Sequence, residues 1–370
     1  MLSKKLRSFM IALSLGCAPS VFAALDFEDH AFPEFVTSAR ALAMGNAYIS
    51  KVDDAWSAFY NPAGLGTVRE SSLQLANAHL EASQGLLSTI SDGPAYKIPK
   101  NYLDSYKSQK LREELAKDPG TLSHSRINLF PNFTARYITL GYLFSQRNRA
   151  IVNKDAANTF ELAERRDHGP VMALNASLFG GVLKFGVSGV YLFRRELYKS
   201  VGPNDPISIN DSVDYKTGQG LQLTAGTRLT LPFTYLPAFS AVLRNASNKG
   251  WENVKDGGAP DKIKQTIDVG FSITPQIGKT TRLHMEVDLK DLNDAYDTSS
   301  KRRIAAGMEL DFNRRIFLRA GYGDGWGSGG IGVRSRTFIL DLTTYAVDRS
   351  RDGFREDEDR RYVLSISSGI

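Results

Sequence analysis

Apolar and polar residues alternate along most of the chain after residue 70. From Leu221 to Leu231, every second residue is leucine, alanine or threonine, and the residues between them are polar or glycine. From Leu283 to Leu289, leucine, methionine and valine alternate with histidine, glutamate and aspartate. Successive side chains of a strand point to opposite faces, so this period of two predicts strands with one apolar and one polar face. We therefore expect an all-β protein.

About fourteen segments of this kind follow one another, each roughly ten residues long. They lie near 71–80, 127–137, 138–147, 158–179, 182–198, 213–231, 237–246, 263–274, 281–290, 302–312, 315–323, 328–336, 337–346 and 361–369. Long polar connections such as 81–126 alternate with short ones such as 313–314. A globular sandwich also shows alternating strands, but long loops at one end and tight turns at the other are typical of a transmembrane antiparallel β-barrel.

The polar faces of these strands carry many charges, for example at Lys184, Glu286 and Glu309. A basic side chain turned into the middle of a bilayer would cost about 2–4 kcal/mol, and an acidic one somewhat less. The charges are therefore expected to line the lumen, where acids and bases can pair. The apolar faces add aromatic residues near strand ends, such as Tyr322 and Phe338, as expected at a lipid–water interface.

The first 23 residues have the pattern of a cleaved signal peptide. Three basic residues precede the apolar stretch 8–17, and small residues lead to Ala23. Cys17 could instead accept a lipid, but Ser14 stands where lipoprotein signals usually place leucine. We expect export and cleavage after Ala23, and a final location in the outer membrane of a Gram-negative bacterium.

Composition excludes several other classes. The leader holds three of the 46 basic residues and no acidic one, so 43 basic residues would face 40 acidic residues, which gives no support to nucleic-acid binding. The only cysteine lies in the leader, and no apolar run after it approaches the roughly eighteen residues of a transmembrane helix. The five histidines are scattered outside any hydrolase motif. We expect no enzyme activity, no cofactor and no metal.

Residues 37–65 differ from the rest, because they do not alternate and are rich in alanine and glycine. Small residues allow close approach of the backbone, and Asn61-Pro62 followed by Gly64 predicts a tight turn. Arg40 and the pair Asp53-Asp54 bring charge into this segment.

Three motifs in this stretch carry a family resemblance. The pattern from Ser38 to Ala47 (SARALAMGNA), then Asp-Asp-Ala, then YNPAGL resembles the N-terminal segment of FadL-type outer-membrane transporters, whose superfamily also holds PorV-like and TraF-like proteins. The resemblance implies a plug over residues 24–70 inside a barrel over residues 71–370. It implies these plug residues: Ser38, Arg40, Ala41, Gly45, Asp53, Asp54, Asn61, Pro62, Ala63 and Gly64. In that family the plug blocks simple diffusion, and hydrophobic compounds leave laterally through a kinked strand.

Five inward-facing positions are candidate contacts for a ligand: Arg194, Arg228, Arg282, His284 and Arg303. The arginines could form a ladder that binds the carboxylate of an acidic ligand, or they could neutralise acids of the lumen. His284 with its neighbouring carboxylates could form a proton relay or a metal site, or simply an ion-paired wall. Likewise, the helix expected in the 81–126 loop could help to bind a ligand, as in the resembled family, or only cap the barrel.

These observations lead to two functional hypotheses. The first is a FadL-like transporter of a hydrophobic or amphipathic, fatty-acid-like small molecule, with membrane lipid and lipopolysaccharide around it. The second is a barrel that does not transport and serves as a scaffold or docking partner for secretion or conjugation proteins. The charged lumen weakens the first, because a transporter needs an apolar pocket beside the plug. An open porin is disfavoured because the plug would fill its lumen.

Overall fold

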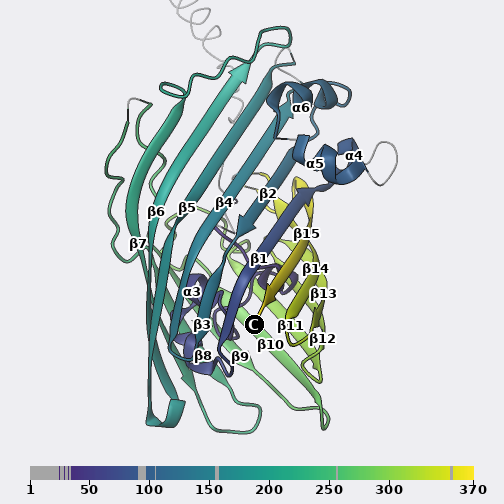
Figure 1. Cartoon of the computed structure of the whole chain (residues 1–370). Coiled ribbons are helices and arrows are strands. Elements are labelled where there is room, and N and C mark those ends of the chain that lie inside the picture. The colour runs from purple at the N-terminus through teal and green to yellow at the C-terminus, as the bar shows by residue number, and fades with distance from the viewer. Residues whose placement is uncertain are drawn as a thin grey trace, which may run out of the picture.

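The chain folds into an antiparallel sheet that closes on itself (Figure 1). The computed structural model describes Leu25, Asp29 and Phe32 and residues 35–90, 97–104, 106–154, 158–255, 257–350 and 353–370. Apart from the two strand segments at 123–129 and 132–135, which follow one another along one position, each strand pairs with its neighbour in sequence, and the last strand pairs with the first. The expected signal peptide, residues 1–23, lies outside the described residues, so its cleavage stays a prediction.

The strands occupy fourteen positions in the barrel, as the alternating pattern predicts. They are β1 (Ser72–Ser83), β2 (Ser123–Leu129), β3 (Asn132–Ala135), β4 (Ile138–Val152), β5 (Phe160–Leu178), β6 (Leu183–Val201), β7 (Tyr215–Thr230), β8 (Ala238–Arg244), β9 (Thr266–Ile273), β10 (Thr281–Leu289), β11 (Ile304–Phe312), β12 (Ile316–Gly323), β13 (Trp326–Arg334), β14 (Phe338–Asp348) and β15 (Glu358–Gly369). β2 and β3 share one position, because both pair with β1 and with β4.

Short helices lie in two parts of the chain. Before β1 come α2 (Ala39–Ala43), α3 (Ser57–Tyr60) and the 3₁₀ helix η1 (Pro62–Thr67), and between β1 and β2 come α4 (Gln84–Ile90), α5 (Ile98–Asp104) and α6 (Ser108–Leu115). A further 3₁₀ turn, η3 (Phe179–Gly181), joins β5 to β6. In the part of the chain that the structure describes, none of these helices has the length and apolar character to cross a bilayer.

Two local expectations need correction. The strand predicted at 127–137 begins at Ser123 and is interrupted at Phe130-Pro131, because proline has no N–H to give to the ladder. The single helix expected over 102–117 is two helices, α5 and α6. α4 and α5 also lie against the outer face of the barrel rather than over its mouth, since Leu86 and Ile90 pack on outward-facing Ala82.

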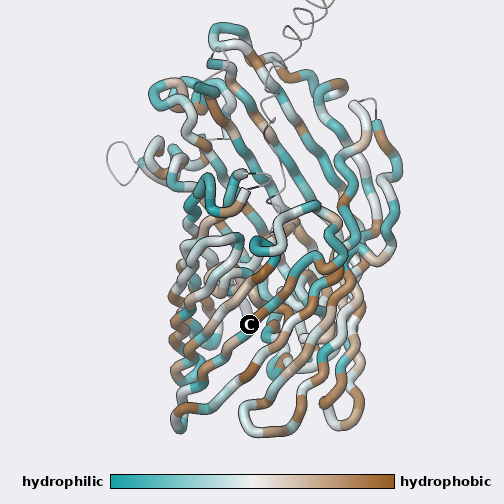
Figure 2. Tube along the Cα trace, turned by 180° about the vertical axis from the view of Figure 1, so that it is seen from behind, coloured by the Kyte–Doolittle hydropathy of each residue, from teal (hydrophilic) through white to brown (hydrophobic). Residues whose placement is uncertain are grey.

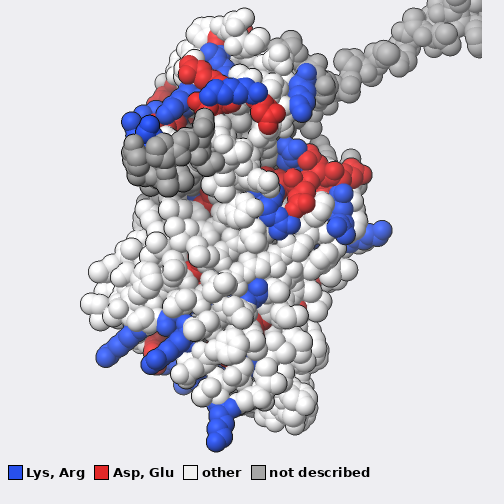
Figure 3. All heavy atoms as spheres, turned by 90° about the vertical axis from the view of Figure 1, so that its right-hand side faces the viewer, with Lys and Arg blue, Asp and Glu red and all other residues white. Residues whose placement is uncertain are grey.

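The wall is uneven in height. β4 to β7 contain 15 to 19 residues each, whereas β8 to β13 contain 7 to 9. Apolar positions dominate the lower part of the tube and polar ones the upper part (Figure 2). Figure 3 shows the same division on one face, where an almost uncharged band separates charges near the loops from charges at the turns.

The outer face of the tall part marks where the lipid-facing band ends. Tyr142, His168 and Phe193 form an outward stack on β4, β5 and β6, with ring centroids 6.1 and 5.1 Å apart. Beyond this stack, Leu111 and Leu115 of α6 cover the same face of the wall. Aromatic rings are common at the membrane interface, so the upper ends of β4 to β7 stand outside the lipid.

Candidate functional site: the filled lumen

Residues 35–68, called here the lumenal segment, fill the interior of the barrel. Nearly all of their side chains are buried. η1 contacts β5, β6 and β7, whereas α2 contacts β12, β13 and β14 on the other side of the sheet. Only a segment inside the closed sheet can touch both sides. Pro62 starts η1, and the Asn61 side chain accepts a hydrogen bond from the N–H of Ala63, which fixes the turn predicted there.

Glycines allow the lumenal segment to press its backbone against the wall. A Cβ on Gly186 of β6 would lie 2.2 Å from the carbonyl carbon of Pro62, and one on Gly321 of β12 would lie 2.1 Å from that of Met44. Gly45 itself has φ +65° and lies against the backbone of Tyr322. No other residue type fits these places, so segment and wall are matched in shape.

Arg40 is the centre of a buried ion-pair network. Its Nε and Nη2 donate to the two carboxylate oxygens of Glu309 on β11, at 2.7 and 2.6 Å. Its Nη1 donates to Asp53 at 2.7 Å and to Asp54 at 3.3 Å, and the Tyr48 hydroxyl donates to Asp54 at 2.7 Å. These charges thus join the first helix of the segment to its middle and to the wall.

The pKa values of the two neighbouring aspartates of this network are shifted in opposite directions. Burial raises the pKa of Asp53, but the positive charges of Arg40 and Lys51 outweigh burial and hold that pKa well below its usual range. Burial also raises the pKa of Asp54, and there Arg40 offsets only part of the effect while Asp53 adds to it. Of the two aspartates, Asp53 is the one whose charged form Arg40 and Lys51 favour.

Two wall carboxylates hold the backbone of the lumenal segment. Asp288 on β10 accepts hydrogen bonds from the N–H groups of Tyr48 and Ile49 at 2.8 and 3.3 Å, and Glu286 accepts one from the N–H of Ser50. His284 Nε2 lies 3.0 Å from Glu286. This strand therefore anchors the segment. Within the described residues, no three His, Cys, Asp or Glu side chains are grouped as metal ligands.

The structure does not bring the five predicted ligand contacts together. Arg194 lies toward the loop end, where its Nε and Nη2 each donate to Asp167 at 2.7 Å. Arg303, at the loop end of β11, donates to the carbonyl of Asp291 at 2.9 Å. Arg228 lies at the turn end and donates to the Val52 carbonyl at 3.4 Å.

The remaining two predicted contacts also lie at the turn end. Arg282 and His284 follow the start of β10, and His284 Nδ1 lies 2.9 Å from the Thr274 hydroxyl. The arginines form no continuous ladder along the lumen. A ligand-binding role for any of the five stays a prediction.

One side of the lumen is apolar, which the sequence analysis missed. Phe130 and inward-facing residues of β4, β5 and β6 pack against Trp56 and Phe59 of the lumenal segment. The ring centroid of Phe130 is 5.0 Å from that of Phe59 and 5.8 Å from that of Trp56. The wall residues of this apolar side are Phe130, Leu143, Val171, Ala173, Val190 and Leu192. Runs such as Val190 to Phe193, apolar on both faces, were the available signal.

The sheet is irregular beside this apolar side. The register of β1 with β15 shifts between Gln74 and Ala76, and the β1 residues opposite Phe130-Pro131 have no ladder partner in β2 or β3. The N–H of Phe130 still donates to the Asn77 carbonyl at 3.0 Å. Leu75 at the bulge is 68% exposed on the lipid-facing side. β1 thus lacks ladder partners at residues 75–77 on the side of β2 and β3, and at Leu75 alone on the side of β15.

A second buried charge cluster was also missed. Glu81 accepts a hydrogen bond from the Tyr345 hydroxyl at 2.6 Å and lies 2.7 Å from His124 Nε2. Asp29 pairs with Arg361 at 2.7 Å and with Arg149. Glu81 and His124 lie in the connection predicted at 81–126 but belong to β1 and β2, and the closure of β15 on β1 brings Tyr345 and Arg361 beside Glu81.

Comparison with known proteins identifies the fold. No protein-family model matches the sequence, and no curated protein sequence matches it either. Among solved structures, the CymD monoaromatic hydrocarbon channel superposes with a TM-score of 0.51 at 11% identity, over 90% of this chain and 96% of that one. A deletion mutant of the TodX monoaromatic hydrocarbon channel gives 0.50 at 10% identity, over 90% and 98%.

Other similar structures superpose less well. CdiB from Acinetobacter baumannii gives a TM-score of 0.35 at 10% identity. The match covers 82% of this chain but only 60% of the length of CdiB. A FadL homologue from Pseudomonas aeruginosa gives 0.30 at 8% identity, over 90% of this chain and 98% of that one.

The molecule is therefore a closed antiparallel β-barrel with a filled lumen, and two solved channels share its fold at 11% and 10% identity. This fold, a barrel whose lumen is filled by an N-terminal segment, is the one that the resemblance of the N-terminal motifs to FadL-type transporters implies.

Proposed function

We propose that this protein is a FadL-like transporter that carries hydrophobic or amphipathic small molecules across the outer membrane of a Gram-negative bacterium. The lumenal segment acts as its plug, and the chain reaches the membrane after export and cleavage of residues 1–23. Lipid and lipopolysaccharide surround the barrel. The observation that carries the proposal is the apolar side of the lumen, which connects the plug to the irregular part of the wall.

This apolar side offers a route that avoids the ion-pair networks. A compound that moves along β4 to β6 contacts aliphatic and aromatic side chains and reaches Phe130. There the ladder between β1 and its neighbours is interrupted, and Leu75, Leu129 and Phe133 on the outer face are exposed to lipid. A hydrophobic molecule leaving sideways at this place would not cross the charged contacts of Arg40. CymD and TodX are described as monoaromatic hydrocarbon channels, which agrees with an apolar cargo.

Passage requires the plug to move. The cavity beside Phe59 has a volume of about 50 Å³ and is lined by Phe35, Val190 and Arg244 among others. This volume is far below the roughly 300–1,000 Å³ of sites that enclose a small molecule. A cargo must therefore displace part of the lumenal segment from the apolar side before it reaches the wall.

Uptake of radiolabelled oleate and toluene by cells that lack their own channels tests the proposal. Cells producing the protein should take up at least one of them faster than cells with an empty vector. Phe130→Ser places a hydroxyl on the apolar route and should lower the initial rate about tenfold, roughly 1.4 kcal/mol of barrier. The matched control is Asn132→Ser. Asn132 also faces inward, on β3 directly after the interruption, but its side chain is already polar.

Equal uptake with and without the protein would reject transport of these compounds. The scaffold hypothesis would then be favoured, and the structural feature that supports it is the tall wall of β4 to β7 beyond the lipid. In that case a secretion or conjugation protein should co-purify with the barrel, and its binding should be insensitive to Phe130→Ser.

A further inference from the structure

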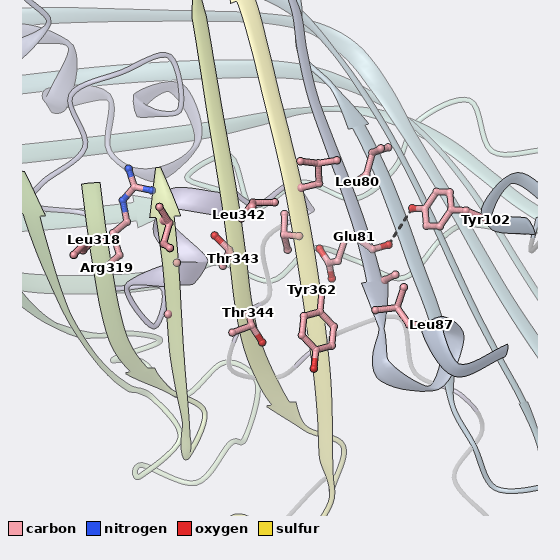
Figure 4. Close-up of a pocket in the computed structure, with 16 residues that line it drawn as sticks. Leu80, Glu81, Leu87, Tyr102, Leu318, Arg319, Leu342, Thr343, Thr344 and Tyr362 are labelled. Atoms are coloured by element: carbon pink, nitrogen blue, oxygen red, sulfur yellow. Dashed lines mark hydrogen bonds between the residues drawn. The ribbon is translucent and has the colours of Figure 1, made fainter. Parts of the chain in front are cut away.

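A groove of about 670 Å³ lies on the outer face of the barrel, across β12 to β15 and β1 (Figure 4). Its lining is strongly apolar and includes Leu318, Ile331, Leu342, Leu364 and Leu80. These residues alternate with inward-facing ones on their strands, so the groove opens toward the membrane and is separate from the lumen.

The groove is hollow at its floor because three adjacent strands carry small residues at positions that pair across the sheet. Gly329 of β13 pairs with Ala320 of β12 on one side and with Thr344 of β14 on the other. A Cβ on Gly329 would meet only the Arg319 carbonyl oxygen at 3.4 Å, so the glycine is not required by packing within the wall. Tyr362 of β15 pairs with Thr344 and borders the row with a large side chain.

The loop helices form a roof over one end of the groove. Leu87 of α4 and Tyr102 of α5 contribute to its lining. The Tyr102 hydroxyl donates to the backbone carbonyls of Glu81 and Arg126, at 3.0 Å each, which fixes α5 on the outside of β1 and β2. Figure 1 shows α4 and α5 projecting outward from the wall beside β1 and β15.

We propose that this groove binds one acyl chain of a membrane phospholipid. It is continuous with the lipid-facing surface, since Leu318, Ile331 and Leu342 are exposed there. The groove is apolar along its length and charged at one end, as a lipid is. On the loop side the apolar lining ends at the outward-facing ion pair of Glu358 and Arg360. Arg360 also donates a hydrogen bond to the Gly327 carbonyl at 2.8 Å. The chain lies below that charged level and the head group beside it.

A further feature favours a lipid chain as the occupant over a second copy of the barrel. The projecting helices stand beside the floor of the groove and keep a flat barrel wall away from Gly329.

Native mass spectrometry of the detergent-purified, delipidated protein, titrated with dipalmitoyl phosphatidylglycerol, tests this site. The wild type should retain one lipid at concentrations where Gly329→Leu, which fills the floor, binds it about tenfold more weakly. Gly189→Leu is the matched control, because Gly189 is an outward glycine on β6 whose Cβ would make only ordinary contacts of 3.4 and 3.5 Å. Leu87→Gln opens the roof without touching the wall and should weaken binding as well.

Equal lipid binding by the wild type, Gly329→Leu and Leu87→Gln would overturn the proposal. So would a dimer of the wild type that Gly329→Leu converts to monomers, because the groove would then hold a second copy. Heat-modified migration on gels identifies the folded barrel in every variant, so loss of folding is not mistaken for loss of lipid. The uptake measurements concern the lumen and are independent of this result.

Discussion

At the scale of single residues, the lumenal segment depends on charges that are satisfied only as a group. Glu309 pairs with Arg40 of the segment and also accepts from Arg319 of β12 at 2.8 Å. Arg319 in turn donates to Asp341 of β14 at 2.6 Å. Removing one member of such a buried network leaves its partner desolvated without a counter-charge, which costs more than the whole pair contributes.

The substitution Glu309→Gln should therefore lower the free energy of unfolding by about 3–5 kcal/mol. Urea unfolding of the refolded protein in detergent, followed by tryptophan fluorescence, measures this change. Glu114→Gln removes an acid from the surface pair with Lys117 on the loop side of α6 and should change the same quantity by no more than about 1 kcal/mol. Equal effects of the two substitutions would contradict the role of Glu309 as an anchor.

The pH dependence of stability should follow Asp53. Its pKa in the folded protein is below the unfolded value of 3.8, so its ionised form stabilises the folded state above pH 3.8. That contribution is lost as the pH falls through the folded pKa. Asp53→Asn should be less stable than the wild type at neutral pH by an amount that shrinks below pH 3.8, as read from urea midpoints across pH. A difference that grows in acid would show that Arg40 does not hold Asp53 ionised.

At the scale of elements, the wall strands are shaped to receive the lumenal segment. Gly186 faces inward against Pro62, and Gly189 faces outward on the same strand. Alternation gives their faces, since Gly186 falls in line with Lys184 and Ser188 and Gly189 with Val187 and Tyr191, but it does not show which face meets another main chain. Only the inward position is in contact with another main chain.

Alanine at these two glycines separates the effects. Gly186→Ala should destabilise the barrel by about 1–3 kcal/mol, because its methyl group must push η1 away from the wall. Gly189→Ala should change the stability by no more than about 0.5 kcal/mol. Thermal unfolding in detergent measures both, and limited proteolysis within residues 35–68 should become faster only for Gly186→Ala. Equal protease resistance would mean that the segment does not rest on this glycine.

The strands could be predicted because the period-two pattern is a local property of each strand. The break at Phe130-Pro131 was missed, although Pro131 and the apolar run Leu129-Phe130-Pro131 marked it in the sequence. Arg40, Asp53 and Asp54 were singled out from short motifs, and they do meet. Their partner Glu309 could be placed on an inward face but not beside Arg40, since alternation gives the face of a residue and not its neighbour across the lumen.

At the scale of the whole molecule, the barrel has a lower part in lipid and an upper wall outside it. Arg166 and Leu174 are both outward-facing on β5, one beyond the aromatic stack at His168 and one below it. Single cysteines at these positions test the boundary. Arg166→Cys should react with a membrane-impermeant maleimide on intact cells, and Leu174→Cys should react only after the membrane is dissolved. The opposite order would place the lipid band elsewhere.

The contacts of the lumenal segment also set an order of events in time. Arg40 binds Glu309 across 269 positions of sequence, the Ala39 carbonyl accepts from Thr343 across 304, and Asp29 binds Arg361 across 332. The part of this sequence that is made first thus finds its partners on the strands that are made last. Filling the lumen and closing β15 on β1 must be completed together, late in assembly. Such long-range contacts slow folding, so the unfinished chain needs protection until its final strands arrive.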